Sequence, residues 1–285
     1  MNTSFDEQLH ELIARALQED VGEGDHTTLS CIDADARGKA VLKIKQAGVL
    51  AGMQIAEAVF RQVEPGCVIT SLMKDGDAMQ VGDKAFEMEA RVHTILTCER
   101  VVLNTMQRMS GIATLTKRFA NKVKDYPVRI LDTRKTTPGF RLLEKEAVRI
   151  GGGYNHRFAL YDQILLKDNH IDYCGGIDQA LNRAWEYIQK IKPGLKIEIE
   201  TRNMDEVEQV LKNGKADRIM LDNFTPEQLD EAVKRIDKVM ETEASGGLNM
   251  DNILAYAQTG VDYLSIGALI HQATGLDMSL KATIK

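Results

Sequence analysis

Cationic side chains gather between residues 132 and 172 of a chain whose net charge is −6. They are Arg134, Lys135, Arg141, Lys145, Arg149, Arg157 and Lys167. The guanidinium of arginine is a planar fork that suits carboxylate or phosphate, and lysine adds a compact point charge. Because the chain as a whole is acidic, this concentration of positive charge predicts a binding site for a polyanion.

Part of this cluster has a plainer interpretation as the solvated face of a helix. Arg141, Lys145 and Arg149 lie four residues apart with glutamates among them, which is the spacing of ion pairs on a helix surface. Arg134 and Lys135 fit that interpretation less well, because they directly follow an apolar run and precede Thr-Thr-Pro-Gly.

Three carboxylates form a second group. Glu198 and Glu200 alternate along one predicted strand, so both face the same side. With Asp222 they offer oxygen ligands for Mg2+, directly or through water and substrate hydroxyls. The alternative is that one carboxylate neutralises Lys167 or Arg157, and the sequence leaves both interpretations, and the choice between the two glutamates, open.

Three glycines at 151–153 precede His156 and Arg157. Glycine allows positive φ angles and a close approach of backbone to ligand, although the same run would also serve as a linker. His156 stands beside Arg157, which favours anion binding, whereas we expect an ordinary hydrogen-bonding role for His170.

Two further glycine motifs, Ser-Gly-Gly at 245–247 and Ser-Ile-Gly-Ala at 265–268, lie near the end of the chain, about 20 residues apart. Each follows a predicted strand and precedes a predicted helix. Backbone N–H groups at a helix start bind phosphate, and the last two loops of a βα barrel are the usual phosphate site. Together the motifs predict a phosphorylated ligand.

The elements that must position these residues are strands and helices in alternation. The predicted strands are 129–132, 163–167, 196–200, 218–222, 239–245 and 262–266, and the predicted helices are 178–191, 204–213, 226–236 and 250–259. Such alternation indicates a parallel sheet. A complete barrel needs about 250 residues, so roughly 150 predict an open, incomplete (β/α) barrel of six or seven strands.

Polar residues end most of these strands. In parallel barrels the carboxyl ends of the strands meet at one mouth, where active sites lie. The residues predicted to ring that mouth are Asp132, Lys167, Glu200, Asp222 and Ser245. The alternative is that each polar residue merely begins a loop.

The first part of the chain has a different pattern of apolar and polar residues. It predicts a helix at 6–19 with a Ser4/Glu7 capping box, strands near 40–45 and 86–91, a helix at 53–63, and a long helix from Thr94 toward Ser110-Gly111. This mixture predicts an α+β sandwich at 1–110. The α/β chain would then continue as the barrel at 111–285, with room for the last residues to return to the N-terminal domain.

Composition excludes several classes of protein. Lys plus Arg total 36 against 42 Asp plus Glu, which argues against generic nucleic-acid or anionic-membrane binding. The N-terminus lacks the pattern of a signal peptide, and no apolar run reaches the ~18 residues of a membrane span. Four scattered cysteines lack CxxC spacing, so neither structural disulfides nor a thiolate zinc site are expected. We expect a cytoplasmic protein.

Several short motifs, in order along nearly the whole chain, resemble quinolinate phosphoribosyltransferase, also called carboxylating nicotinate-nucleotide pyrophosphorylase. The motifs stand at 19–28, 99–104, 107–114, 132–139, 151–157, 167–170, 221–223 and 243–247. Each motif is short, but the set is specific.

The resemblance implies a fold and a reaction. The family joins an α/β sandwich to an open α/β barrel and works as a homodimer or, in some members, a hexamer. It condenses quinolinate with phosphoribosyl pyrophosphate, in the presence of Mg2+, and releases pyrophosphate and CO2. The product is nicotinate mononucleotide, in de novo NAD biosynthesis.

The resemblance also implies roles for individual residues. The implied substrate-binding residues are Arg100, Thr133, Arg134, Lys135, His156, Arg157, Lys167, Glu200, Asp222, Ser245, Gly246, Gly247, Ile266, Gly267 and Ala268. Of these, Lys135, Lys167, Glu200 and Asp222 are implied to be catalytic. Glu200 and Asp222 match the acidic pair near the ribose and Mg2+, in direct or indirect contact. Arg100 matches an arginine contributed by the neighbouring subunit.

Two other classes of function compete with this interpretation. Lys167 at a strand end is also the arrangement of a barrel aldolase that forms a Schiff base. A non-catalytic nucleotide sensor would bind the same ligands without turnover, although the carboxylate pair makes that less attractive.

Overall fold

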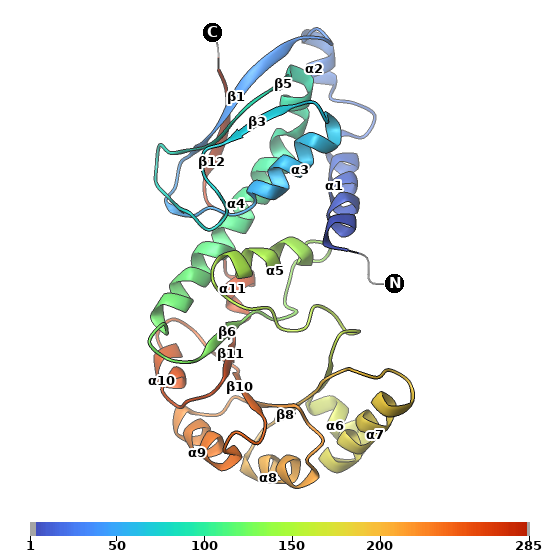
Figure 1. Cartoon of the computed structure of the whole chain (residues 1–285), viewed down its shortest axis with the longest axis vertical. Helices are drawn as coiled ribbons and strands as arrows, with labels where there is room; N and C mark the ends of the chain where they lie inside the picture. Colours follow the sequence, from blue (N-terminus) through green and yellow to red (C-terminus); the bar gives the residue numbers. More distant parts are fainter. Residues whose placement is uncertain (1–3, 284–285) are drawn as a thin grey trace. The chain divides into compact units, whose positions relative to one another are not determined.

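The computed structural model describes residues 4–283, and Figure 1 shows its elements in sequence colours. The chain divides into two compact units. The first contains the residues up to Lys117, Thr136–Gly152 and the residues from Leu269 onward, and the second contains Arg118–Lys135 and Gly153–Ala268.

The first unit is built on a four-stranded antiparallel sheet in the order β12-β1-β5-β3. Its strands are β1 (Arg37–Ile44), β3 (Val68–Ser71), β5 (Lys84–Arg91) and β12 (Met278–Thr283), with a small ladder of β2 (Gly48–Val49) and β4 (Ala78–Met79). Its helices are α1 (Phe5–Val21), α2 (His26–Cys31), α3 (Met53–Val63) and α5 (Arg141–Ile150), with most of α4 (Val92–Lys122) and α11 (Ala268–His271).

Local sequence explains several of these elements. Strand β5 buries Phe86, Met88 and Ala90 while the residues between them face outward or lie half-buried, which is the alternation of a half-buried strand. Helix α1 begins at the predicted capping box, in which Ser4 accepts the N–H of Glu7 and Glu7 accepts the N–H of Ser4. These predictions are confirmed.

The predicted end of the long helix is wrong. Helix α4 begins at Val92 and passes Ser110 and Gly111 without a break. Both residues serve close packing instead: the buried Ser110 Oγ accepts the N–H of Ala51 at 2.9 Å. A Cβ added to Gly111 would lie 2.0 Å from the carbonyl oxygen of Thr274.

The interpretation of α5 as a solvated face is also wrong in part. Arg149 is exposed and pairs with Glu146, as expected. Lys145, however, is only 1% exposed, and Glu144 is fully buried against Arg108. This turn of the helix therefore belongs to the interior of the first unit.

The second unit contains a six-stranded parallel sheet in the order β6-β11-β10-β9-β8-β7. The strands are β6 (Arg129–Leu131), β7 (Ile164–Leu166), β8 (Ile197–Thr201), β9 (Arg218–Asp222), β10 (Glu241–Ser245) and β11 (Tyr263–Ser265). Strands β6 and β7 are the two edges of the ladder, so the barrel is open, as predicted.

Helices connect most of the strands of this sheet. They are α6 (Asp168–Cys174), α7 (Ile177–Lys190), α8 (Met204–Asn213), α9 (Pro226–Ile236) and α10 (Ile253–Ala257). Helix α9 shows why they begin where they do: Thr225 caps it, Pro226 takes the first position, and Gln228 completes a capping box. Within residues 4–283, no helix combines the length and the apolar character needed to cross a bilayer.

Candidate functional site

The carboxyl ends of the parallel strands carry the five residues predicted to ring the barrel mouth. Asp132 and Lys167 directly follow β6 and β7, and Glu200, Asp222 and Ser245 stand in the last two residues of β8, β9 and β10. Asp222 and Ser245 are direct partners across the ladder. The structure therefore brings these residues to one edge of one sheet.

Glu200 and Asp222 lie on the same face of neighbouring strands. Glu200 pairs in register with Met220, two residues before Asp222, and residues two apart on a strand share a face. The Lys167 Nζ lies 3.0 Å from Glu200 Oε2, so the alternative in which a carboxylate neutralises this lysine is realised. Asp222 accepts hydrogen bonds from Ser245 Oγ and Asn223 Nδ2. These hard carboxylate oxygens are a suitable donor set for Mg2+.

The loop after β10 has a backbone conformation that favours glycine. Gly246 has φ 93°, and a Cβ there would lie 2.1 Å from Asn223 Oδ1. Gly247 follows with φ 61°, and its carbonyl accepts from the side chains of Asn249 and Asn252. The backbone therefore turns tightly at the strand end beside Asp222.

The loop after β11 begins with a residue whose N–H is already used. Ile266 donates its N–H to the carbonyl oxygen of Leu131, at 2.9 Å. Gly267 and Ala268 follow, and α11 starts at Ala268. Any phosphate contact in this loop would therefore come from positions after Ile266.

A buried aspartate joins the two cation-bearing segments of the second unit. Asp132 Oδ1 accepts the N–H of His156 at 2.9 Å, and Leu131 forms a parallel bridge with Tyr154. The loop that carries Arg134 and Lys135 thus leaves β6 beside the segment that carries His156 and Arg157. Thr133 Oγ accepts the N–H of Lys135 and shapes the start of that loop.

Arg157 is a half-buried cation with a like charge nearby. Its Nη1 donates to the carbonyl oxygen of Gln163 at 3.1 Å. Burial, followed by repulsion from Arg134, lowers the pKa of the Arg157 guanidinium. Arginine stays charged in proteins, so an anion between these two cations would relieve the repulsion.

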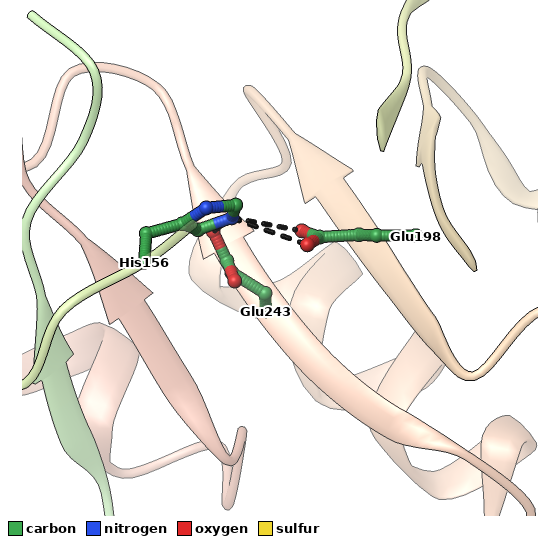
Figure 2. Close-up of side chains that lie close together, drawn as sticks. All are labelled: His156, Glu198 and Glu243. Carbon is green, nitrogen blue, oxygen red and sulfur yellow. Dashed lines mark hydrogen bonds and ion pairs between the residues drawn. The ribbon is translucent and has the colours of Figure 1, made fainter. Parts of the chain in front are cut away.

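A buried group of three titratable side chains lies below this edge. Figure 2 shows His156 with Glu198 and Glu243, whose possible ligand atoms all lie within 4.8 Å of one another. His156 Nε2 is 3.1 Å from Glu198 Oε2 and 3.5 Å from Glu243 Oε1. Both carboxylates are fully buried.

The electrostatics of this group favour a bound proton. Burial first, and then repulsion from Glu198, raises the pKa of Glu243 to about 7. Although burial lowers the pKa of His156, Glu198 and Glu243 together raise it above its ordinary value.

The spacing of the three residues could also hold a metal ion. However, Arg218 Nη1 lies 3.0 Å from Glu243 Oε2, and Gln163 Nε2 donates to Glu198 Oε2 at 2.7 Å. The Oε2 oxygen of each carboxylate therefore already has a cationic or hydrogen-bonding partner, and a dication there would face the charge of Arg218. A proton fits this donor set better than a metal does.

Comparison with known proteins identifies the family. Residues 25–110 match the model for the N-terminal domain of quinolinate phosphoribosyl transferase, and residues 112–281 match the model for its C-terminal domain. This chain belongs to the quinolinate phosphoribosyltransferase family. The family prediction made from the short motifs is confirmed.

Individual relatives agree with this family over almost the full chain. "Quinolinate phosphoribosyltransferase [decarboxylating] 1b" of Nicotiana tabacum is 43% identical in an alignment 285 positions long, gaps included, that covers 95% of this chain and 81% of that protein. The "Probable nicotinate-nucleotide pyrophosphorylase [carboxylating]" of Bacillus subtilis (strain 168) is 39% identical, covering 97% and 94%. The crystal structure of NadC from Streptococcus pyogenes has a TM-score of 0.91 at 38% identity and covers 99% of each chain.

One of the site residues implied by the quinolinate phosphoribosyltransferase motifs lies in the first unit. Arg100 belongs to α4, its side chain is 61% exposed, and its guanidinium pairs with the adjacent Glu99. The other predicted site residues all belong to the second unit.

Sequence reasoning missed three residues of the network around His156 and Glu198. It did not select Gln163, Arg218 or Glu243, although the last stands in a motif of the quinolinate phosphoribosyltransferase family. A signal was present for Glu243, because Glu241, Glu243 and Ser245 alternate along one strand and so share the face that carries the site. No sequence pattern connects Gln163 with Glu198 or Arg218 with Glu243, because these contacts arise only when the sheet forms.

Proposed function

We propose that this protein transfers the phosphoribosyl group of phosphoribosyl pyrophosphate to quinolinate with decarboxylation. The products are nicotinate mononucleotide, pyrophosphate and CO2, in de novo NAD biosynthesis. One observation carries the proposal: a chain that matches both domains of the family gathers cations and carboxylates at the carboxyl edge of one parallel sheet. The same family membership argues against an aldolase that uses Lys167.

The cations of the second unit bind the two anionic substrates. Thr133, Arg134, Lys135, Arg157 and Lys167 form the proposed site for the dicarboxylate and for pyrophosphate, and His156 supports it by accepting the backbone N–H of Arg157. The repulsion between Arg134 and Arg157 supports this assignment, because a bound anion would neutralise both. Arginine forks bind carboxylates in two-point geometry, and this orients the pyridine ring as well as holding it.

Glu200 and Asp222 serve the ribose. Loss of pyrophosphate builds positive charge at the anomeric carbon, and nearby carboxylates stabilise such charge, as they do in glycosidases. The same two residues would hold Mg2+, directly or through water, and a bound Mg2+ supplies charge neutralisation for the leaving pyrophosphate. Lys167, paired with Glu200, adds a positive charge beside the same centre.

Decarboxylation requires an electron sink. When the ring nitrogen of quinolinate bonds to the anomeric carbon, the ring becomes cationic and stabilises the electron pair left on the adjacent ring carbon as CO2 leaves, and a proton from water then takes the place of the carboxylate. The role of the protein is to place the ring nitrogen at that carbon. Arg134, Lys135 and Arg157 provide this orientation through the two carboxylates of the substrate.

The glycine loops receive the 5′-phosphate. Ser245, Gly246 and Gly247 offer a tight backbone turn beside Asp222, and in the loop after β11 Gly267 and Ala268 offer the N–H groups that follow Ile266, whose own N–H is bonded to Leu131. Glycine allows phosphate oxygens to approach backbone N–H groups closely.

Assembly and location complete the proposal. We expect a homodimer or a hexamer in which the exposed Arg100 reaches the active site of the neighbouring subunit. We expect a cytoplasmic protein, which agrees with four cysteines that are all free. Sedimentation of the purified protein measures the assembly, and a monomer would contradict it.

A direct assay tests the activity. The purified protein is mixed with phosphoribosyl pyrophosphate, Mg2+ and quinolinate, and nicotinate mononucleotide and CO2 are measured. Nicotinate in place of quinolinate is the matched control, because its product is the same but no CO2 is released. Product from quinolinate alone supports the proposal, and product from nicotinate alone overturns the substrate assignment.

A further inference from the structure

Four residues below the proposed quinolinate site close a ring of hydrogen bonds. Glu198 Oε2 accepts from Gln163 Nε2 at 2.7 Å, and the carbonyl oxygen of Gln163 accepts from Arg157 Nη1 at 3.1 Å. The backbone N–H of Arg157 donates to His156 Nδ1 at 2.7 Å. His156 Nε2 then hydrogen-bonds to Glu198 Oε1 at 3.4 Å and lies 3.1 Å from Oε2 of the same carboxylate, where the ring began.

The ring runs from the core toward the site. Glu198 is 0% exposed and His156 is 8% exposed, whereas Gln163 and Arg157 are half-buried. A buried carboxylate that loses its donors is costly, so Glu198 holds both Gln163 and His156 in place. Because Glu198 stands within β8, its own backbone is fixed by ladders on both sides.

Hydrogen bonding assigns the state of the imidazole. Nδ1 of His156 accepts a backbone N–H, so the proton of the neutral ring sits on Nε2 and points to Glu198. Both ring nitrogens are therefore engaged inside the protein. His156 reaches the substrate site only through the backbone of Arg157.

Arg157 remains available to a ligand. Among residues 4–283, the guanidinium has one hydrogen-bond partner, the carbonyl oxygen of Gln163. An arginine has five N–H donors in a rigid fork, so most of its donors remain for a carboxylate. The four-residue ring thus fixes one N–H donor of the Arg157 guanidinium and leaves the other donors for a ligand.

We propose that Glu198 is a positioning residue for quinolinate recognition, which fixes the guanidinium of Arg157 through Gln163 and His156 without touching the substrate. The inference rests on the proposed function, because it takes Arg157 to bind quinolinate. Two further charged groups lie near the four-residue ring. Glu243 approaches His156 Nε2, and Arg218 pairs with Glu243.

The side chain of Gln163 offers the cleanest test. Gln163→Ala removes the hydrogen bond to Glu198 but keeps the carbonyl that Arg157 uses. Losing one hydrogen bond to a charged group corresponds to an about tenfold rise in the KM of quinolinate, with kcat and the KM of phosphoribosyl pyrophosphate unchanged. Glu241→Gln is the matched control, because Glu241 pairs with Arg218 but stands outside the ring. Equal changes in both KM values would overturn the proposal.

A double-mutant cycle shows whether the effect passes through Arg157. Arg157→Lys keeps the positive charge but removes the guanidinium that donates to the carbonyl oxygen of Gln163. In that background Gln163→Ala should change the KM of quinolinate by less than about twofold, because coupled residues are not additive. A full tenfold effect in both backgrounds would show that Gln163 acts by another route and would contradict the proposal.

A spectroscopic measurement separates this inference from the proposed function. In 15N NMR spectra of the wild-type protein, His156 should carry its proton on Nε2, and Glu198→Gln should change that tautomer or its exchange with water. A wild-type His156 protonated on Nδ1 alone would contradict the four-residue ring of hydrogen bonds and, with it, the positioning role of Glu198. A wild-type protein with the expected tautomer but no affinity for quinolinate would instead overturn the proposed function.

Discussion

The two sheets of this protein treat charged side chains in opposite ways. On β5 of the first unit, Glu87 and Glu89 point outward and pair with Lys84 and Lys39, with all four side chains about half exposed. On β8 and β10 of the second unit, Glu198 and Glu243 are fully buried. Exposed ion pairs contribute little to stability, whereas buried charges are tolerated only with partners. We infer from this difference that Glu198 and Glu243 are buried in the parallel sheet because the candidate site needs them there.

The largest effect on stability is expected at Arg218. Above pH 8, where Glu243 has lost its proton, Arg218→Met would leave this buried carboxylate without its cation, and breaking such a pair costs about 4 kcal/mol in the free energy of unfolding. Chemical denaturation measures this. A loss below about 1 kcal/mol would mean that the buried and exposed carboxylates do not differ as the comparison requires.

Glu243 should make stability depend on pH. Its pKa is raised from 4.5 to about 7, so between these values the folded protein holds a proton that the unfolded chain has released. The free energy of unfolding therefore falls as the pH rises through this window, by up to about 3 kcal/mol. The raised pKa of His156 acts in the same direction.

The matching variant is Glu243→Gln, which cannot lose the proton. Its melting temperature should vary less between pH 5 and pH 8 than that of the wild-type protein. Parallel curves for the two proteins would show that Glu243 does not hold the proton.

Two glycines give a matched pair, one in each unit. Gly246→Ala combines a positive φ with a clash against Asn223, whereas Gly82→Ala has a similar φ of 97° and nothing within 4 Å. We expect costs of about 3 and about 1 kcal/mol respectively. Thermal melting compares them, and equal costs would show that the loop beside Asp222 has room to relax.

The smallest effect is expected on the exposed sheet. Glu89→Gln removes a surface ion pair with Lys39, and we expect a change below about 0.5 kcal/mol in the free energy of unfolding. Denaturation at low and high salt would check this. A loss above about 2 kcal/mol would remove the contrast between the two sheets.

Much of the fold could be predicted because its signals are local. The alternation along β5, the capping box of α1 and the polar ends of the parallel strands are all read within a few neighbouring residues. Helix α4 was predicted too short, because Ser110 and Gly111 are usually signs of a helix end but here pack against Ala51 and Thr274. Only the folded chain brings those contacts together.

Some contacts of the candidate site could likewise be predicted from local sequence, and others could not. The strand-end residues Lys167, Glu200 and Asp222 were predicted to lie at one edge of the sheet because parallel strands end there, and the structure places them at that edge, with Lys167 paired to Glu200. The partners of His156 were not predicted, because Glu198 and Glu243 are 42 and 87 residues away in sequence from His156 (198 − 156 and 243 − 156). The roles assigned to the substrate-binding residues remain predictions.

Calorimetric titration with quinolinate tests the central claim, that the cations at the edge of the parallel sheet recognise this dicarboxylate. The account predicts measurable binding to the wild-type protein and its loss in Lys135→Ala and in Arg157→Ala, with the fold intact by circular dichroism. Unchanged affinity in both variants would contradict it.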